Sequence, residues 1–267
     1  MNLNKHKTMK NLVFTLLLLF SVSLMAQDPA QKGLEVAKAA DAYDQGFGSS
    51  VTKLTMILTN KQGQESTRYM SNQTLELTED GDKSLIVFDS PRDVKGTATL
   101  TYTHKEGSDD QWLYLPAVKR VKRISSDNKS GPFMGSEFAY EDLSSQEVEK
   151  YTYKFLKEEQ FNGVDTYVIE RDPVDPKSGY TRQVVWYNKE NYRLEKMDFY
   201  DRKNALLKTL TYANYKVYKE KHWRAGEMNM VNHQTGKKTK LIFEDYNFDL
   251  ELTDNDFSQN SLRRASR

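Results

Sequence analysis

Three histidines outside the first 26 residues have the side chains best suited to acid–base chemistry near neutral pH. His104, His222 and His233 are widely separated, and each lies within or at the end of a strand-like segment. The sequence contains no HExxH motif, no Gly-x-Ser-x-Gly motif and no glycine-rich phosphate loop. Because these motifs are missing, the sequence favours isolated histidines over a catalytic group, and we expect a protein that is not an enzyme.

An acidic run, Glu79-Asp80-Gly81-Asp82, has a superficial likeness to the start of a calcium-binding loop. It lacks the alternating ligand spacing and the distal glutamate that such a loop requires. The chain also contains no cysteine, which excludes thiolate metal sites and disulfides. We therefore expect a hairpin turn here, no bound metal and no cofactor.

A dense cationic run begins at Lys119. Together with Arg120, Lys122 and Arg123 it makes four of five consecutive residues basic. On a strand these side chains alternate between the two faces, so they do not form one amphipathic face. One interpretation is an edge strand that its charges protect against aggregation. The other is a docking site for lipid headgroups, a membrane surface or an acidic protein patch.

The loop that follows, residues 125–138, places two large apolar side chains among glycines and a proline. Phe133 and Met134 stand in the sequence Gly-Pro-Phe-Met-Gly. Exposed Phe and Met on a loop are unfavourable unless they pack against something. Two interpretations stay open. The pair forms a lid that moves aside for an apolar ligand, or it pins the loop permanently to the core.

The elements that must position these residues are mostly strands. Residues 28–43 predict a helix, with Asp28 as N-cap and Pro29 at the first helical position. From Ser50 onward the apolar period changes to two, in roughly eleven or twelve segments joined by short polar turns. Residues 205–218 and 222–232 are each expected to form one strand. The pattern predicts a mainly β fold, a curled antiparallel meander, and excludes a parallel doubly wound sheet.

A long meander must curl, because otherwise its edges and one apolar face stay exposed. The concave face then either packs into a solid core or encloses a cavity, and composition alone leaves both open. Large apolar side chains that alternate along the strands are available for either arrangement: Trp112, Tyr114, Tyr167, Ile169, Trp186, Met197, Phe199, Met228, Met230 and Ile242.

The N-terminal residues predict export. Three lysines precede an apolar run at residues 12–24, which ends at Met25-Ala26-Gln27. This is the pattern of a secretory signal peptide cleaved after Ala26, and the run is too short for a confident membrane span. An uncleaved anchor is the minority alternative. We expect residues 1–26 to be a signal peptide and residues 27–267 a single domain in the periplasm without a lipid anchor.

The formal net charge limits the kinds of partner that the protein can bind. The signal peptide carries three lysines and no acidic residue, so its removal changes the formal net charge from +1 to about −2. Such a balance excludes a bulk nucleic-acid binder, and the cationic run is a local exception. The C-terminal tail, residues 261–267, is basic and is expected to be frayed.

Several motifs together carry a family resemblance. They are Trp112-Leu113-Tyr114-Leu115-Pro116, Lys119-Arg120-Val121, residues 131–136, Tyr140-Glu141-Asp142-Leu143, residues 91–96 and Phe257-Ser258. In these motifs the chain resembles the LolA-like family of outer membrane lipoprotein-sorting proteins, in the branch with a long basic strand and a Gly-Pro-Phe-Met-Gly-like loop. The resemblance covers essentially the whole chain after the signal peptide. An arginine that the familiar carrier has before a proline on an early strand has no counterpart at residues 77–81.

The resemblance implies an unclosed LolA-like β-barrel whose N-terminal helix and lid elements cover an apolar cavity. It implies a periplasmic carrier or chaperone for the acyl chains of lipoproteins, or for another lipid, on the way to the outer membrane. The implied partners are an inner-membrane exporter and an outer-membrane acceptor, with no cofactor. The alternative is a non-carrier adaptor of an envelope complex such as an RND-type exporter.

Two sets of candidate site residues follow from these interpretations. The lid and cavity candidates are Phe133, Met134, Phe138, Trp186, Met197, Met228 and Met230. The candidates for docking to headgroups or a partner are Lys119, Arg120, Lys122 and Arg123.

Overall fold

The computed structural model describes residues 27–248 and 250–265, and the expected signal peptide lies outside these ranges. A helix, α2 (Pro29–Asp44), precedes a large sheet, and a second helix, α3 (Gln259–Ala265), follows it. The strands are β1 (Ser49–Thr59), β2 (Glu65–Leu75), β3 (Lys83–Ser90), β4 (Ala98–Tyr102), β5 (Asp110–Leu115), β6 (Arg120–Ile124), β7 (Tyr151–Phe161), β8 (Val164–Pro173), β9 (Tyr180–Asn188), β10 (Leu194–Asp201), β11 (Leu206–Ala213), β12 (Lys216–Tyr218), β13 (His222–Arg224), β14 (Glu227–Asn232) and β15 (Lys238–Phe248).

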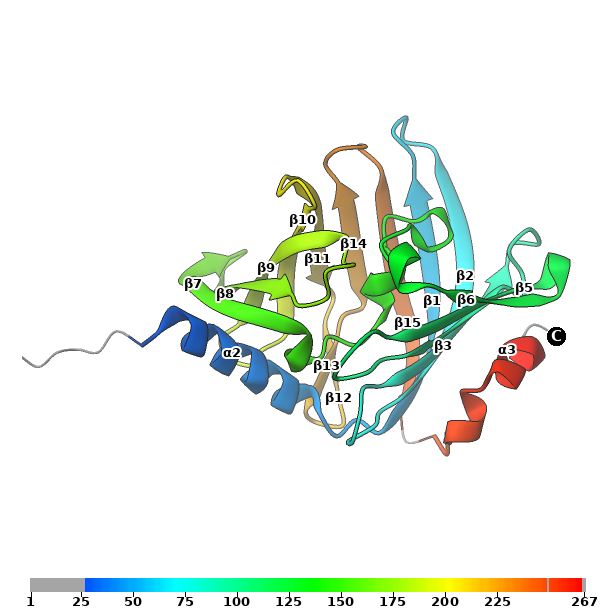
Figure 1. The fold of residues 1–267 in the computed structure, drawn as a ribbon, viewed down its shortest axis with the longest axis horizontal. Coiled ribbons are helices and arrows are strands. Elements are labelled where there is room, and N and C mark those ends of the chain that lie inside the picture. The colour runs from blue at the N-terminus through cyan, green and yellow to red at the C-terminus, as the bar shows by residue number, and fades with distance from the viewer. Residues whose placement is uncertain (1–26, 249, 266–267) are drawn as a thin grey trace, which may run out of the picture.

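Thirteen of these strands form one antiparallel sheet in the order β6-β5-β4-β3-β2-β1-β15-β14-β11-β10-β9-β8-β7. The first and last strands, β1 and β15, pair in the middle, so each half of the chain builds one wing. The outer strands β6 and β7 do not pair with each other, and the sheet curls without closing (Figure 1). The predicted curled meander and unclosed barrel are confirmed.

The turn between β7 and β8 illustrates how local sequence produces the meander. Asn162 and Gly163 have φ angles of 50° and 81°. A two-residue hairpin turn of type I′ requires positive φ at both positions, which Asn-Gly adopts readily. Its twist matches that of the flanking strands, so β7 returns directly as β8.

The predicted N-terminal helix is confirmed as α2, whose first turn is capped by the side chain of Asp28. α2 packs mainly against β7. A Cβ atom at Gly33 would lie 2.8 Å from the backbone N of Phe155 and 2.9 Å from the backbone of Lys154. Only glycine permits this approach of helix to strand, which places α2 along the open side of the sheet.

Residues 125–150, hereafter the inner segment, connect the two outer strands and lie against the concave face. The segment contains four short 3₁₀ turns, namely η2 (Ser126–Asn128), η3 (Phe133–Gly135), η4 (Tyr140–Leu143) and η5 (Val148–Lys150). A further turn, η1 (Pro116–Val118), joins β5 to β6. Apolar residues of the inner segment and of the concave strands share one core, which includes Met56, Met70, Phe88, Phe133, Phe138, Ile169, Val185, Leu210 and Met230.

Two expectations for the strands beyond Ala205 are wrong in detail. Each of the two predicted long strands is divided, and β12 and β13 form a separate two-stranded sheet. Asn214, with φ of 58°, ends β11, and the backbone N–H of Gly226 donates to the carbonyls of Ala213 and Asn214. The chain therefore leaves the main sheet after β11 and returns to it as β14.

The prediction of a frayed C-terminal tail is also wrong for the part that the structure describes. α3 covers the convex face of β4 and β5 (Figure 1). Leu262 is fully buried there beside Phe257, against Leu85 and Leu100. Burial of these side chains stabilises a short helix that its own sequence would not. Within the described ranges, no helix is both long enough and apolar enough to cross a membrane.

Candidate ligand-binding site

A cavity of about 850 Å³ lies on the concave side of the sheet beside α2. Its walls come from α2, the turn at residues 76–82 and the end of the inner segment. Strands β1, β2, β7 to β11, β14 and β15 and the end of β13 complete them. Small-molecule sites usually measure roughly 300–1,000 Å³. The cavity is therefore large enough for a lipid-sized ligand, and we treat it as the candidate site.

Tyrosine rings form much of this wall. Tyr153, Tyr187, Tyr212 and Tyr215 line the cavity. The hydroxyl of Tyr153 donates to a backbone carbonyl at 3.0 Å, and that of Tyr215 also donates to a backbone carbonyl. Burial raises the pKa of Tyr153 and of Tyr212, so both stay neutral phenols at physiological pH. Neutral rings whose hydroxyls are already bonded present apolar surface with polar tips.

One cation is buried at this wall. Arg171, on β8, lines the cavity although only 2% of its surface is exposed. Its Nε donates to Gln183 Oε1 at 2.7 Å and its Nη2 to Gln146 Oε1 at 2.6 Å. Its guanidinium carbon also lies 4.4 Å from the ring centre of Tyr151. No carboxylate within the described ranges forms an ion pair with Arg171.

Carboxyl groups occupy another part of the wall. Burial, together with repulsion from neighbouring carboxylates, raises the pKa of Asp82 to about 6 and that of Glu147 to about 7. The pKa of Asp41 on α2 is also raised, first by burial and then by repulsion from Glu149. These groups do not make a metal site, since the described residues contain no group of three or more His, Cys, Asp or Glu side chains placed to hold an ion.

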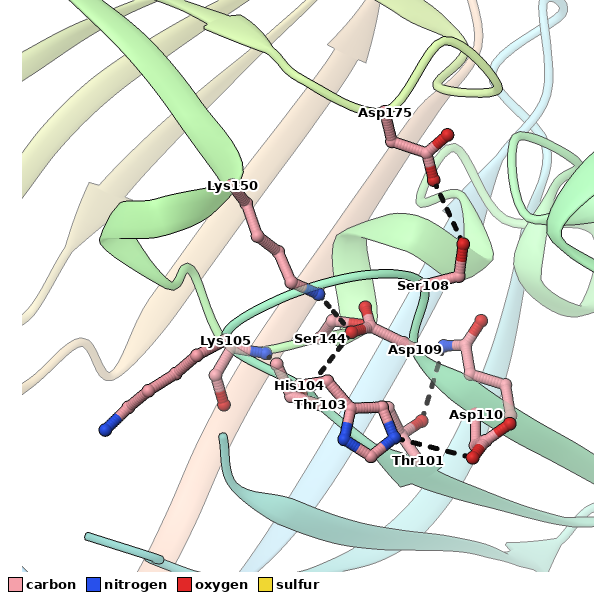
Figure 2. A network of polar contacts seen from close by, with 12 residues as sticks. Thr101, Thr103, His104, Lys105, Ser108, Asp109, Asp110, Ser144, Lys150 and Asp175 are labelled. Atoms are coloured by element: carbon pink, nitrogen blue, oxygen red, sulfur yellow. Dashed lines mark hydrogen bonds and ion pairs between the residues drawn. The ribbon is translucent and has the colours of Figure 1, made fainter. Parts of the chain in front are cut away.

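A polar network beside the cavity joins the two wings of the sheet (Figure 2). In the turn between β4 and β5, Asp109 pairs with Lys150, which ends η5 just before β7. Ser108 in the same turn donates to Asp175 in the loop between β8 and β9. His104 Nδ1 lies 2.7 Å from Asp80, in the turn that borders the cavity. The network links the two ends of the open sheet through side chains where strand pairing is missing.

The histidines do not form a common site. Burial lowers the pKa of His104, but hydrogen bonds to Asp80 and Asp110 outweigh it and raise the pKa. His222, on β13, packs at the edge of the Phe47 ring. His233 lies in the turn after β14, where its ring contacts the hydroxyl of Thr209 on β11. Each histidine has a different set of neighbours, as their sequence separation indicated.

The predicted lid residues lie in the core rather than at the cavity. Phe133 is 1% exposed and packs between the rings of Phe88 and Tyr140, with centroids 5.7 Å and 5.6 Å away. Phe138 is buried in the same core. Met134 is half-buried, and its carbonyl accepts a hydrogen bond from Arg68. In this structure the loop is packed against the core, which is the arrangement expected of a pin.

Of the other predicted cavity residues, Met228 lines the cavity. Met197 and Met230 are buried in the concave core beneath it. Trp186 lies on the opposite face of β9, where it packs with Val168 and Val184 and donates from its indole N–H to Glu159. Alternation explains this split, because neighbouring residues of a strand point to opposite faces.

The cationic run lies at the edge of the sheet, where β6 forms one outer strand. Lys119, Arg120, Lys122 and Arg123 are all exposed, and Arg123 pairs with Asp110. Both earlier interpretations fit this position, since a charged edge resists aggregation and also presents cations to a partner.

Sequence reasoning missed Arg171. A signal was present, because Tyr167, Ile169 and Arg171 occupy alternate positions of one strand. A charged residue in register with an apolar alternation is directed to the buried face, where a charge needs a specific reason. The family resemblance implied an apolar cavity, whereas the walls combine rings, carboxyl groups and several cations, of which Arg171 is the buried one.

Comparison with proteins of known structure identifies the fold class. A LolA superfamily protein from Nitrosomonas europaea superposes with a TM-score of 0.70 at 21% identity, over 87% of this chain and 99% of that chain. A family model described only as that of an uncharacterized protein matches residues 80–264. No match was found among curated proteins. The molecule therefore has the LolA-like fold that its motifs predicted.

Two crystal structures share more of the sequence. One is a domain from Vibrio parahaemolyticus, provisionally assigned as an outer membrane lipoprotein-sorting protein. It is 60% identical with a TM-score of 0.87, over 88% of this chain and 100% of that chain. The other, a DUF1329 family protein from Desulfovibrio piger, is 32% identical with a TM-score of 0.83, over 88% and 99% of the two chains. The chain belongs to the DUF1329 family, within the LolA-like fold class.

Proposed function

We propose that the protein is a periplasmic carrier that holds lipid, either the acyl chains of a lipoprotein or another amphiphile, in the cavity for transfer toward the outer membrane. The observation that carries the proposal is the 850 Å³ cavity beside α2, on the concave face of the unclosed sheet. Its size and tyrosine walls fit a flexible ligand with both apolar and polar parts.

A carrier must release what it binds. Each buried methylene contributes about 0.8 kcal/mol, so a wholly apolar enclosure would hold a long acyl chain very tightly. Here carboxyl groups and Arg171 interrupt the ring surface. Polar groups reduce the free energy gained by an apolar chain, which favours exchange over permanent binding.

The proposed location and partners follow from the N-terminus and from β6. A cleaved signal peptide would deliver the chain to the periplasm, as expected for a relative of a lipoprotein-sorting domain. The exposed cations of β6, Lys119, Arg120, Lys122 and Arg123, would meet anionic headgroups or an acidic face of a donor or acceptor. No catalysis is needed for this role.

The second candidate function is a non-carrier adaptor in an envelope complex such as an exporter. It is favoured by the free edge of β6, whose unpaired backbone and cations are suited to a protein partner. An adaptor requires no occupant in the cavity, so the two functions differ in whether lipid co-purifies with the protein.

Native mass spectrometry of protein isolated from a periplasmic extract tests the carrier function. We expect adducts with the masses of lipids, and binding of a fluorescent fatty-acyl probe to the emptied protein. Ala40 lines the cavity on α2, so Ala40→Trp should fill part of it and weaken probe binding at least about tenfold.

Ala30 supplies the matched control, since it is exposed on the first turn of the same helix. Ala30→Trp should bind the probe as the wild type does. Recovery of empty protein that also fails to bind the probe would rule out the carrier function. A partner captured by that same empty protein would favour the adaptor.

A further inference from the structure

Among the residues that the structure describes, no carboxylate balances the charge of the buried guanidinium of Arg171. Its hydrogen bonds to Gln146 and Gln183 satisfy donors but do not neutralise a cation, and the nearby Tyr151 ring adds a weaker attraction. A buried charge is costly unless it is paired. The side chain is therefore held in a position whose charge only a further group can balance.

Acidic groups of the inner segment do not supply that balance. Asp142 pairs with Lys208 at 2.6 Å and accepts a hydrogen bond from Tyr180. Glu141 accepts hydrogen bonds from the Ser178 hydroxyl and from a backbone N–H. Both carboxylates thus have other partners, and no carboxylate within the described ranges pairs with Arg171.

The two glutamines that hold Arg171 differ in exposure. Gln183 is buried opposite Arg171 in the β8–β9 pairing, so it fixes the orientation of the guanidinium. Gln146 lines the cavity and is exposed. An oxygen anion entering the cavity can replace the Gln146 amide oxygen, because it accepts the same hydrogen bond and supplies the missing negative charge.

We infer that Arg171 binds the anionic end of an amphiphile, a carboxylate or phosphate group, whose apolar part lies along the tyrosine rings of the cavity. Arginine suits this role because its planar fork matches both oxyanions. The inference rests on the proposed carrier function and narrows its cargo. Acyl chains of a lipoprotein end in methyl groups, whereas a free fatty acid or a phosphate-headed lipid carries the anion that Arg171 requires.

Calorimetric titration of the delipidated full chain with matched twelve-carbon ligands tests the inference. Dodecanoate and dodecyl phosphate carry the anion, and dodecan-1-ol is the neutral arm. We expect the wild type to bind at least one anionic ligand about tenfold or more tighter than the alcohol. The preferred anionic arm identifies the headgroup as carboxylate or phosphate.

In Arg171→Met the preference for the anion should disappear while alcohol binding is retained. The alcohol arm also reports whether the variant folds. Arg182→Met is the matched control, since Arg182 pairs with Glu170 at 3.0 Å and does not line the cavity. It should keep the wild-type preference. In Gln146→Ala, which removes the competing amide, dodecanoate or dodecyl phosphate should bind about threefold or more tighter.

Equal affinity of the wild type for anionic and neutral ligands would overturn the inference and leave the carrier function intact. So would an unchanged preference in Arg171→Met, or weaker anion binding in Gln146→Ala. Acetate or inorganic phosphate that binds as tightly as the twelve-carbon anions would show a site for free anions. If no twelve-carbon ligand binds the wild type, the carrier function itself fails. Should Arg171→Met not fold, the wild-type preference and Gln146→Ala still decide.

Discussion

The ammonium group of Lys208 lies 2.6 Å from the carboxylate of Asp142, and both side chains are buried, at 4% and 7% exposure. Lys208 belongs to β11 and Asp142 to η4 of the inner segment. Lys208 also donates to the carbonyl of Glu137, and Asp142 accepts from the hydroxyl of Tyr180. This pair anchors the inner segment to the concave face, between the two wings of the open sheet.

Removing one partner of this pair should be strongly destabilising. We expect Lys208→Met to lower the free energy of unfolding by about 3–5 kcal/mol, because Asp142 is left charged and buried. The double variant Lys208→Met with Asp142→Leu should recover much of the loss. Lys240→Met removes a more exposed pair with Glu227 and should cost less than about 1 kcal/mol. Denaturant unfolding measures all three, and equal losses for Lys208→Met and Lys240→Met would contradict burial as the cause.

The approach of α2 to β7 makes a second prediction. Alanine is favoured over glycine in a helix by about 1 kcal/mol, but a Cβ at Gly33 would meet the backbone of Lys154 and Phe155 at 2.8–2.9 Å. We expect Gly33→Ala to destabilise the protein by about 1–3 kcal/mol, since backbone cannot move aside as a flexible side chain can. Thermal unfolding provides the measurement, with the exposed helix substitution Lys38→Ala as control. A gain in stability for Gly33→Ala would show that α2 is not packed this closely.

Glu147 should make stability depend on pH. Burial, and then repulsion from Asp82 and Asp41, raise its pKa to about 7 from the usual 4.5. The folded state therefore binds the Glu147 proton more tightly than the unfolded state does. The contribution of the protonated carboxyl group to stability is complete below pH of about 4.5 and is lost as pH rises through about 7. Glu147→Gln should match the wild type near pH 4 and exceed its stability above pH 8 by on the order of 2–3 kcal/mol.

Unfolding by denaturant across this pH range checks the Glu147 prediction. Glu149→Gln alters an exposed neighbour and should show a difference from wild type of less than about 0.5 kcal/mol throughout. If Glu147→Gln were no more stable than the wild type at high pH, the carboxyl group would not be buried as described.

Truncation of Phe133 tests whether the loop at residues 125–138 is a fixed part of the core or a movable lid. A residue that only packs the core leaves a cavity when truncated, so Phe133→Ala should lower the free energy of unfolding by about 3–5 kcal/mol. Lipid affinity should stay within about threefold of wild type, because Phe133 does not line the cavity. Calorimetric titration below the unfolding temperature separates these effects. A large change in affinity with little loss of stability would identify the loop as a lid.

Much of the fold was predictable because it rests on local patterns. Asp28-Pro29 marks the start of α2, Asn162-Gly163 sets a hairpin turn, and alternation identifies most strands. Where the local sequence pattern and the tertiary contacts favoured different secondary structures, the tertiary contacts determined the one that forms. α3 forms because Leu262 is buried against the convex face, and the strand predicted from Ala205 divides after Ala213 because the chain leaves the main sheet.

The candidate site was less predictable for a physical reason. Strand alternation places Arg171 on a buried face, but it does not say which side chains from other strands surround it. Gln146 and Tyr187 reach it from distant parts of the sequence, as a result of sheet register and curvature. The sequence by itself determined the mainly β class and the cationic run. Only the tertiary structure decided that this run lies on a free edge, that Phe133 is buried in the core and that the cavity contains a cation without a counter-charge. Those properties depend on contacts between residues far apart in the chain.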